Sequence, residues 1–219
     1  MTRQPWREVA AGYDAGAIGY DARHDGRRDR AHARRIERPM LDAAQGATRV
    51  LELGVGTGRV LAQVAAPVRI GVDVAARMLD VAAGKGLAVV RADAHRLPFA
   101  ARSFDAVLAG GGVFRYLDAA TALAEVARVL VGGGILAIHQ FGARTWGLRG
   151  ARRPDPRVRE LDRVEDLTGT ATAVGFAVER VVRWRTIRLP PFLVEIPPWL
   201  DRHSSIQLWS QVVVVMRGA

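Results

Sequence analysis

The amino-acid sequence predicts an α/β fold in which a mostly parallel sheet is covered by helices on both faces. Three observations lead to this prediction. From Arg49 onward, short apolar runs alternate with amphipathic stretches. The apolar runs are continuous, which is typical of strands that are buried on both faces of a parallel sheet. The chain has 219 residues, of which 49% are hydrophobic, so it can bury a sizeable core.

Five strands and three helices are expected between residues 49 and 141. The strands are expected at Val50–Leu53, Val68–Val72, Leu87–Val90, Phe104–Ala109 and Ile135–Phe141. The helices are expected at Gly58–Ala65, Ala75–Ala83 and Thr121–Leu130. Asp118 is a suitable N-cap for the third helix, in which apolar side chains recur at helical spacing. Three glycines, Gly132 to Gly134, then stop this helix.

The rest of the chain divides into a leading segment, two variable segments and a late helix with two strands. Residues 1–45 are expected to form a small helical cap over the mouth of the sheet, with a helix from about residue 27 to 44 that ends or kinks near Pro39. Residues 46–219 are expected to form one α/β domain that holds the ligand-binding and catalytic site. Within it, 142–163 and 189–204 are expected to be variable substrate or lid segments. A helix near 165–174, a turn at Gly175 and strands at 177–189 and 206–216 complete the order.

Composition excludes several classes of function. Cysteine is absent, which excludes disulfides, cysteine-bound metals and a cysteine nucleophile, and Lys85 is the only lysine. The formal net charge of +10 suggests nucleic acid as a partner, but the arginines alternate with acidic residues, as on solvated faces. Nucleic acid is therefore not favoured. We expect no metal, because His32, His95 and His203 lack ligand spacing. Neither a signal peptide nor a membrane span is visible, so a cytoplasmic location is expected.

A glycine-rich loop at the first strand-to-helix junction is the sharpest local signal. It reads Leu51-Glu52-Leu53-Gly54-Val55-Gly56-Thr57-Gly58. Glycine permits close backbone approach, and a helix N-terminus offers free N–H groups to a negatively charged ligand group. The dinucleotide fingerprint would need glycine at position 59, which is Arg59. Glu52, just before the loop, favours a ligand with an ammonium or sulfonium charge.

Two further acids follow at strand ends. Asp73 closes the second strand about twenty residues after the loop, where a carboxylate can bind both ribose hydroxyls. Asp93 closes the third strand, where it could accept a hydrogen bond from an adenine amino group. Each of these acids could instead be a helix cap or an ordinary loop residue. Met78 is placed to pack on a purine face, and a plain core position is the alternative.

The sequence resembles the class I S-adenosylmethionine-dependent methyltransferases. Five motifs carry the resemblance: YDAGAIGYDAR (13–23), VLELGVGTGRV (50–60), GVDVAARMLDVA (71–82), RADAHRLPFAARSFDAVLAGGGVFRYL (91–117) and ALAEVARVLVGGGILAI (122–138). The resemblance implies a Rossmann-like, seven-stranded, mostly parallel sheet whose last strand is antiparallel. It implies S-adenosylmethionine as cofactor and S-adenosylhomocysteine as product. The chain departs from the family at Gly132, where proline is usual in the turn.

The resemblance also assigns the cofactor-binding residues. It implies that the methionine part of the cofactor lies near Glu52 and Gly110, that Asp73 binds the ribose, and that Asp93 binds the adenine amino group. The complete set of implied cofactor-binding positions is Tyr13, Glu52, Gly54, Gly56, Gly58, Asp73, Val74, Met78, Asp93, Ala94 and Gly110.

Methyl transfer from a sulfonium depends mainly on positioning, so no obligatory nucleophile is expected. A base is needed only where the acceptor arrives protonated. His139, near the end of the fifth strand, is the preferred histidine, with His24 second, although a buried histidine satisfied by its neighbours is the commoner case. Tyr20 is the other candidate catalytic residue, and packing of the cap is its alternative role. Arg115 and Tyr116 are also placed to line the pocket.

Several functions remain to be weighed. A small, partly hydrophobic acceptor is favoured, because the variable segments carry aromatic residues, and the pattern is most similar to quinone-biosynthetic and natural-product enzymes. An RNA methyltransferase that uses the arginine surface is one alternative. A cofactor-binding protein of this fold without methyl transfer is another. The proline-rich connection at 189–200 suggests either a homodimer contact or a lid.

Overall fold

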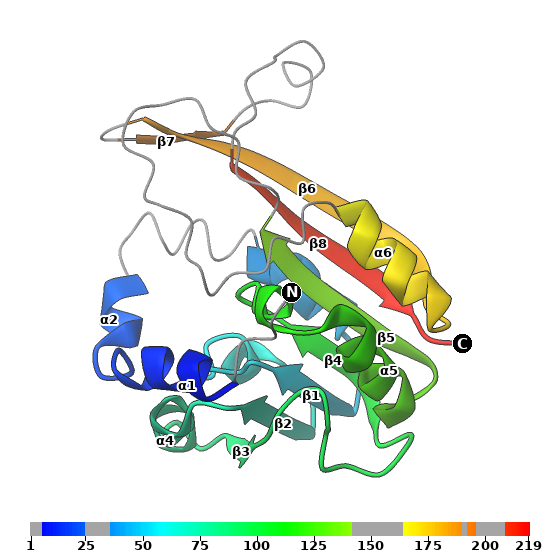
Figure 1. Ribbon diagram of the computed structural model, residues 1–219, viewed down its shortest axis with the longest axis horizontal. Helices are drawn as coiled ribbons and strands as arrows, with labels where there is room; N and C mark the ends of the chain where they lie inside the picture. The colour runs from blue at the N-terminus through cyan, green and yellow to red at the C-terminus, as the bar shows by residue number, and fades with distance from the viewer. Residues whose placement is uncertain (1–5, 25–35, 142–163, 190–191, 196–208) are drawn as a thin grey trace.

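The computed structural model describes residues 6–24, 36–141, 164–189, 192–195 and 209–219, and an eight-stranded mixed sheet organises them. The strands are β1 (Arg49–Leu53), β2 (Val68–Asp73), β3 (Ala88–Arg91), β4 (Phe104–Ala109), β5 (Leu130–Phe141), β6 (Ala177–Leu189), β7 (Phe192–Glu195) and β8 (Trp209–Arg217). The helical elements are α1 (Trp6–Asp14), α2 (Tyr20–His24), η1 (Leu61–Gln63), α4 (Ala76–Ala83), η2 (Val113–Tyr116), α5 (Ala119–Val129) and α6 (Val164–Ala173). Residues 36–43 are also helical. Figure 1 shows their arrangement.

The strand order is β3-β2-β1-β4-β5-β8-β6-β7. The strands from β3 to β5 pair in parallel, whereas β8 runs antiparallel to both β5 and β6. This confirms the mostly parallel sheet with an antiparallel last strand. Beyond the expected seven strands, β7 forms a short hairpin with the end of β6, where a proline-rich connection was expected. The backbone pairing runs from Thr186 opposite Glu195 to Leu189 opposite Phe192.

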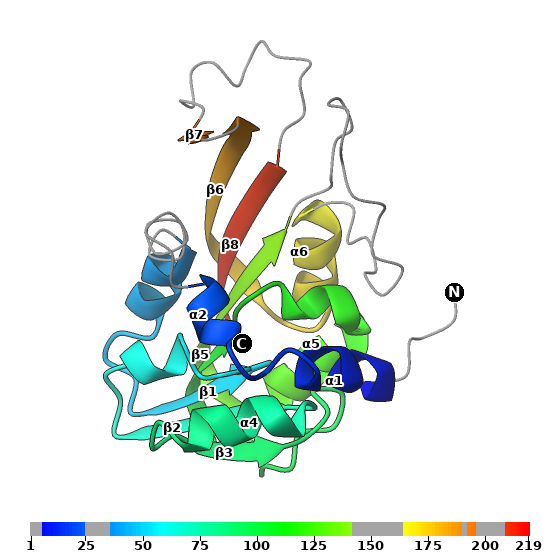
Figure 2. The ribbon, with the colours of Figure 1, turned by 90° about the vertical axis from the view of Figure 1, so that its left-hand side faces the viewer.

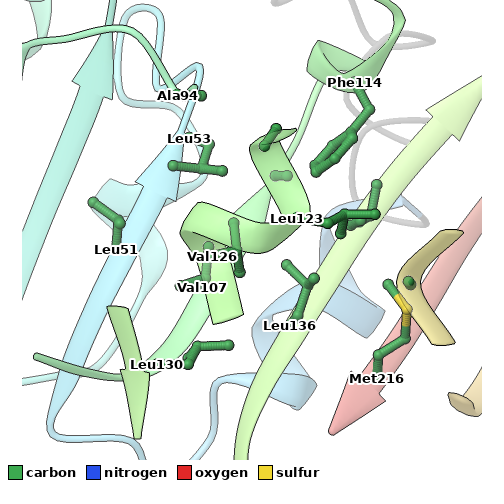
Figure 3. Packing of buried hydrophobic residues seen from close by; sticks show 14 of the residues in the cluster. Leu51, Leu53, Ala94, Val107, Phe114, Leu123, Val126, Leu130, Leu136 and Met216 are labelled. Carbon is green, nitrogen blue, oxygen red and sulfur yellow. The ribbon is translucent and has the colours of Figure 1, made fainter. Parts of the chain in front are cut away.

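Helices cover both faces of the sheet, as the continuous apolar strands predicted. On one face, α5 and α6 pack on alternate strand residues such as Leu51, Val107 and Leu136, and Figure 3 shows Leu123 and Val126 of α5 in this layer. On the other face, the intervening strand residues pack against residues 36–44, η1 and α4. Side chains alternate between faces along a strand, so each strand contributes to both layers.

The leading segment packs against α4 and the glycine loop. Figures 1 and 2 both show α1 beside α4. The Asp14 carboxylate at the end of α1 accepts a hydrogen bond from the Arg77 N–H in the first turn of α4, at 2.8 Å. Asp21 of α2 accepts from the Lys85 ammonium and from the Thr57 hydroxyl, both at 2.6 Å. Burial acts to raise the pKa of Asp21, but these two hydrogen bonds and the positive charges of Lys85 and Arg59 outweigh it, so the pKa lies below its usual value.

One local prediction differs from the structure, and one of the two outcomes expected at Pro39 is excluded. The expected helix at Gly58–Ala65 is only the single 3₁₀ turn η1, and the chain is already extended at Val64. Only nine residues separate Gly58 from β2, and Pro67 among them has no N–H for a helix, so the segment must return to the sheet after one turn. The helix over residues 36–43 continues through Pro39, so this proline does not end it. Residues 27–35, 142–163 and 196–204 lie outside the described part.

Candidate functional site

A cavity of about 460 Å³ lies beyond the carboxyl ends of the neighbouring strands β1 and β4, from which the chain connections leave in opposite directions. The chain leaves β1 for β2 and β3 on one side, then returns to β4 on the other side. Open α/β sheets bind ligands outside the carboxyl ends of their strands at such a switch point. The wall consists of Trp6, Val9, Tyr13, Tyr20, Gly54, Gly56, Val72, Asp73, Val74, Met78, Ala92, Asp93, Ala94, His95, Gly110, Gly111, Val113, Tyr116 and Leu117.

The glycine loop after β1 forms the floor of this cavity. Gly54 and Gly56 have φ of +62° and +53°, a region that side chains disfavour. A Cβ at Gly54 would lie 2.6 Å from a methyl carbon of Val113, so only glycine fits between β1 and the segment after β4. No atom lies within 4 Å of a Cβ at Gly56, whose open side faces the cavity. The loop therefore brings bare backbone to the ligand space.

Asp73, at the end of β2, holds the loop in place. Its Oδ2 accepts the Gly56 N–H at 2.8 Å, and its Oδ1 accepts the Ala75 N–H at 2.9 Å. Burial raises the pKa of this carboxyl above its ordinary value, although these backbone hydrogen bonds lower it. Each carboxylate oxygen has a second acceptor position. Asp73 can therefore fix the loop and still accept hydrogen bonds from hydroxyl groups of a ligand.

The wall beyond Asp73 is apolar and ends in a second acid. Val74 and Met78 belong to an apolar cluster with residues of α1, and Met78 is 1% exposed. Ala94 is buried beside Asp93. The Asp93 carboxylate, after β3, accepts hydrogen bonds from both the backbone and the ring of His95. This half of the cavity combines an apolar surface with one carboxylate at its end.

Residues of α1, α2 and η2 supply the aromatic part of the wall. The hydroxyl groups of Tyr13 and Tyr116 lie 3.1 Å apart, which joins α1 to the segment after β4. Tyr20 stacks on the ring of His24, with ring centres 4.3 Å apart. Burial raises the pKa of Tyr20, so its hydroxyl stays protonated near neutral pH and can donate a hydrogen bond. Arg115, also expected at the pocket, is not among the wall residues.

Three expected site residues lie behind the wall. Glu52 is 3% exposed, and its Oε1 lies 3.4 Å from the position of a Cβ on Gly110. Among the described residues no hydrogen bond reaches its Oε2. Burial raises the pKa of Glu52 well above its usual range, although the Leu61 amide lowers it. Glu52 is thus a buried acid directly beneath a wall glycine.

Gly58 and His139 are also absent from the wall. A Cβ at Gly58 would lie 2.2 Å from a methyl carbon of Leu87, so this glycine allows the loop to pack on the chain before β3. His139 is 2% exposed and pairs with Val213 of β8. By strand alternation it shares the face of Ala137, which packs in the cluster that contains Met40. The structure therefore gives Gly58 a packing environment and places His139 inside the sheet layer.

Several wall residues were not assigned by the sequence. His95, Gly111, Val113 and Leu117 follow expected site residues by a few positions, so proximity in the chain to Asp93 and Gly110 was the available signal. Trp6 of the leading segment also lies on the wall. Over the described ranges, no cluster of three or more potential ligand side chains could hold a metal ion. No helix in those ranges is long and apolar enough to cross a membrane.

Comparison with known proteins agrees with this architecture. Residues 51–138 match a family described as a methyltransferase domain. The demethylmenaquinone methyltransferase of Corynebacterium urealyticum is 35% identical over 140 residues, which cover 62% of this chain and 60% of that protein. The enzyme of the same name from Beutenbergia cavernae is 41% identical over 118 residues, covering 50% and 48%. The chain thus matches less than two thirds of either relative. An uncharacterized protein of Mycobacterium tuberculosis is 34% identical over 201 residues, covering 88% and 67%.

Solved structures share the fold. The [4+2]-cyclase SpnF superposes with a TM-score of 0.73 at 20% identity, covering 100% of this chain and 98% of that one. An S-adenosylmethionine-dependent methyltransferase from Mesorhizobium loti superposes with a TM-score of 0.60 at 19% identity, covering 83% and 97%. Identities this low establish the common architecture only.

Proposed function

The chain belongs to the class I S-adenosylmethionine-dependent methyltransferases, and we propose that it transfers a methyl group from S-adenosylmethionine to an oxygen, nitrogen or carbon nucleophile of a small, partly hydrophobic molecule. One observation carries the proposal: at a single cavity, the glycine loop after β1 meets acids from the ends of β2 and β3 and Gly110 from the end of β4. S-adenosylhomocysteine is the second product.

The residues present suit this cofactor. In the proposed arrangement Asp73 accepts hydrogen bonds from the ribose hydroxyls, Val74 and Met78 pack on the adenine, and Asp93 accepts from its amino group beside Ala94. Tyr13 and the glycine loop, with Gly58 supporting it from behind, enclose the remainder. Glu52 is a buried acid with an oxygen that no described group satisfies. Such a carboxyl is suited to compensate the ammonium group of the methionine part through the thin wall at Gly110.

Positioning explains most of the proposed catalysis. When bound, S-adenosylmethionine supplies a methyl group already activated on a sulfonium sulfur. The chain orients the two reactants and excludes water, an effect worth up to about 7–11 kcal/mol in well-aligned reactions. Tyr20 lies on the cavity wall, whereas His139 does not. We therefore favour Tyr20, as a hydrogen-bond donor, over His139 as the side chain that contacts the acceptor.

The names of the relatives suggest the first acceptors to test. Demethylmenaquinone is a hydrophobic quinone, and its reduced form or a short-chain analogue would suit a wall of Val113, Leu117 and tyrosines. The assay follows the mass gain of one methyl group in the acceptor. Absence of methylated product across a panel of quinols, phenols and amines would contradict transfer to acceptors of these classes.

Cofactor binding is tested first by calorimetric titration. We expect micromolar binding of S-adenosylmethionine and S-adenosylhomocysteine and no binding of NAD. Asp73→Asn removes one acceptor for the ribose and should weaken both adenosyl ligands by at least about tenfold. Asp80→Asn is the matched control, because Asp80 lies exposed on α4 and outside the cavity. Binding of NAD to the wild type as tightly as the two adenosyl ligands would refute the proposal.

A second candidate function follows from the shared fold. SpnF is a [4+2]-cyclase, so this architecture by itself does not establish methyl transfer. Cofactor binding without methylated product would favour a cofactor-binding protein of the same fold. RNA as acceptor is distinguished by salt, because RNA affinity falls steeply with ionic strength. A homodimer and a cytoplasmic location remain proposals, and light scattering over a range of concentrations tests the former.

A further inference from the structure

The ring of His95 connects two walls of the cavity. His95 lies two residues after Asp93 and lines the cavity, with only 10% of its side chain exposed. Its Nδ1 contacts Oδ1 of Asp93 at 2.5 Å. On the other side of the ring, Nε2 accepts the backbone N–H of Asp118 at 2.8 Å. Asp118 is the N-cap of α5 and directly follows the wall residue Leu117.

These contacts define the hydrogen position on the ring. A backbone N–H can only donate, so Nε2 must carry the free lone pair that accepts from Asp118. In neutral imidazole the hydrogen is then on Nδ1, where it donates to Asp93. Both ring nitrogens are therefore satisfied by one tautomer alone.

The tautomer has a direct consequence for the carboxylate of Asp93. Oδ1 accepts from the His95 ring and also from the His95 backbone N–H at 2.9 Å. Both hydrogen bonds that described residues make to this carboxylate therefore end on Oδ1. The side chain of Asp93 is 32% exposed at the cavity, so Oδ2 is the oxygen available to a ligand. A carboxylate oriented in this way accepts a hydrogen bond and offers none.

The same ring also anchors the segment after β4. Gly110, Gly111, Val113, Tyr116 and Leu117 of the wall all lie between β4 and Asp118. The 3₁₀ turn η2 within this segment begins at Val113, and its N-cap is Gly112, which has φ of +70°. The bond from Asp118 to His95 attaches the far end of this segment to the loop after β3.

We propose that His95 is a positioning residue that presents Oδ2 of Asp93 to the exocyclic amino group of the adenine, and that it thereby makes the site selective for adenosyl over inosyl ligands. This inference rests on the proposed function, because it takes the ligand to be an adenosyl compound. An inosyl ligand carries an oxygen in place of that amino group, and two acceptors would then face each other.

The tautomer is tested on the ligand-free protein. Long-range ¹H–¹⁵N spectra of the five histidine rings report which nitrogen is protonated, and the His95→Gln variant identifies the His95 signals by their loss. We expect a ring with its hydrogen on Nδ1 and an unprotonated Nε2. A ring protonated at Nε2, or an average of the two tautomers, would overturn the inference.

Selectivity is tested by the dissociation constants of S-adenosylhomocysteine and its hypoxanthine analogue. The wild type should prefer the adenosyl ligand by about tenfold or more, as expected for one hydrogen bond to a charged acceptor. His95→Leu should reduce this ratio to within about threefold. His95→Asn keeps a donor near Oδ1 of Asp93 and should retain most of it. The exposed Arg96→Gln, one residue along the same loop, should leave the ratio unchanged.

The outcomes separate the two proposals. A preserved preference in His95→Leu, with wild-type binding intact, refutes the role of His95 and leaves the proposed function in place. Absence of S-adenosylhomocysteine binding to the wild type refutes the proposed function, and the inference about selectivity falls with it. A change in affinity for both ligands by the same factor in His95→Leu identifies a general structural effect and also refutes selectivity.

Discussion

Gly58→Ala should destabilise the fold through a defined steric conflict. The added Cβ would lie 2.2 Å from a methyl carbon of Leu87 and 3.3 Å from Cβ of Ala82, and φ at this position is +79°. Left-handed backbone costs an alanine about 1–2 kcal/mol, and overpacking of a filled core costs about 1–3 kcal/mol. We expect a loss of about 2–5 kcal/mol, which lowers Tm by about 4–20 °C in a chain of this size.

Urea and thermal unfolding of four proteins measure this effect: wild type, Gly58→Ala, Leu87→Ala and the double variant. Leu87→Ala removes the conflicting atoms, so the double variant should be more stable than the two single losses predict, by about 1–3 kcal/mol of coupling. Gly56→Ala is the matched control, because its Cβ meets no atom within 4 Å and only the backbone cost of about 1–2 kcal/mol applies. Additive losses, or a Gly58→Ala variant with wild-type Tm, would refute the packing argument.

Three further substitutions have defined outcomes. Burial raises the pKa of Glu52, so the stability contributed by its neutral form is complete below pH 4.5 and is lost as pH rises through the raised pKa. Glu52→Gln should therefore have a higher Tm than the wild type at pH 8 and a similar Tm at pH 4. Thermal melts across this pH range measure the difference. The Arg49 guanidinium lowers the pKa of Asp105, whose contribution is present above pH 3.8 and is lost as pH falls through the lowered pKa; Asp105→Asn should reduce stability at pH 7 by about 1 kcal/mol in urea titrations, with the difference shrinking in acid. Asp14→Ala removes the acceptor for the Arg77 N–H and should cost about 1 kcal/mol, with faster hydrogen exchange at that amide.

The sheet was predictable because its signals are local and repeated. Each parallel strand contains a short run of mostly apolar residues, and β4 and the antiparallel β6 have the bounds that the sequence predicted. Asp118 caps α5 through the Thr121 N–H at 3.0 Å, as the helical spacing indicated. The prediction of a helix after the glycine loop was wrong, because helical spacing of apolar residues carries no information about the distance that the chain must cover to reach the next strand. Space between elements, and not local preference, limits η1 to one turn.

The site was predictable at the ends of strands and less so behind them. Gly54, Asp73, Asp93 and Gly110 reach one cavity because parallel strands end at the same edge. The depth of a side chain beneath that edge has no signature in a single sequence. His139 illustrates this, because one step along β5 decides which face of the sheet its side chain joins.

Lys85 gives this protein an unusual property for chemical labelling. It is the only lysine of the chain, and its ammonium bridges Asp21 of the cap and the carbonyl of Thr57 in the glycine loop, at 2.6 and 2.7 Å. Amine-directed acylation therefore has one side-chain target, located at the junction between cap and loop. An ammonium held by two acceptors reacts only after it is released. The rate at which Lys85 is acylated therefore reports how often the segment that contains Asp21 separates from the glycine loop.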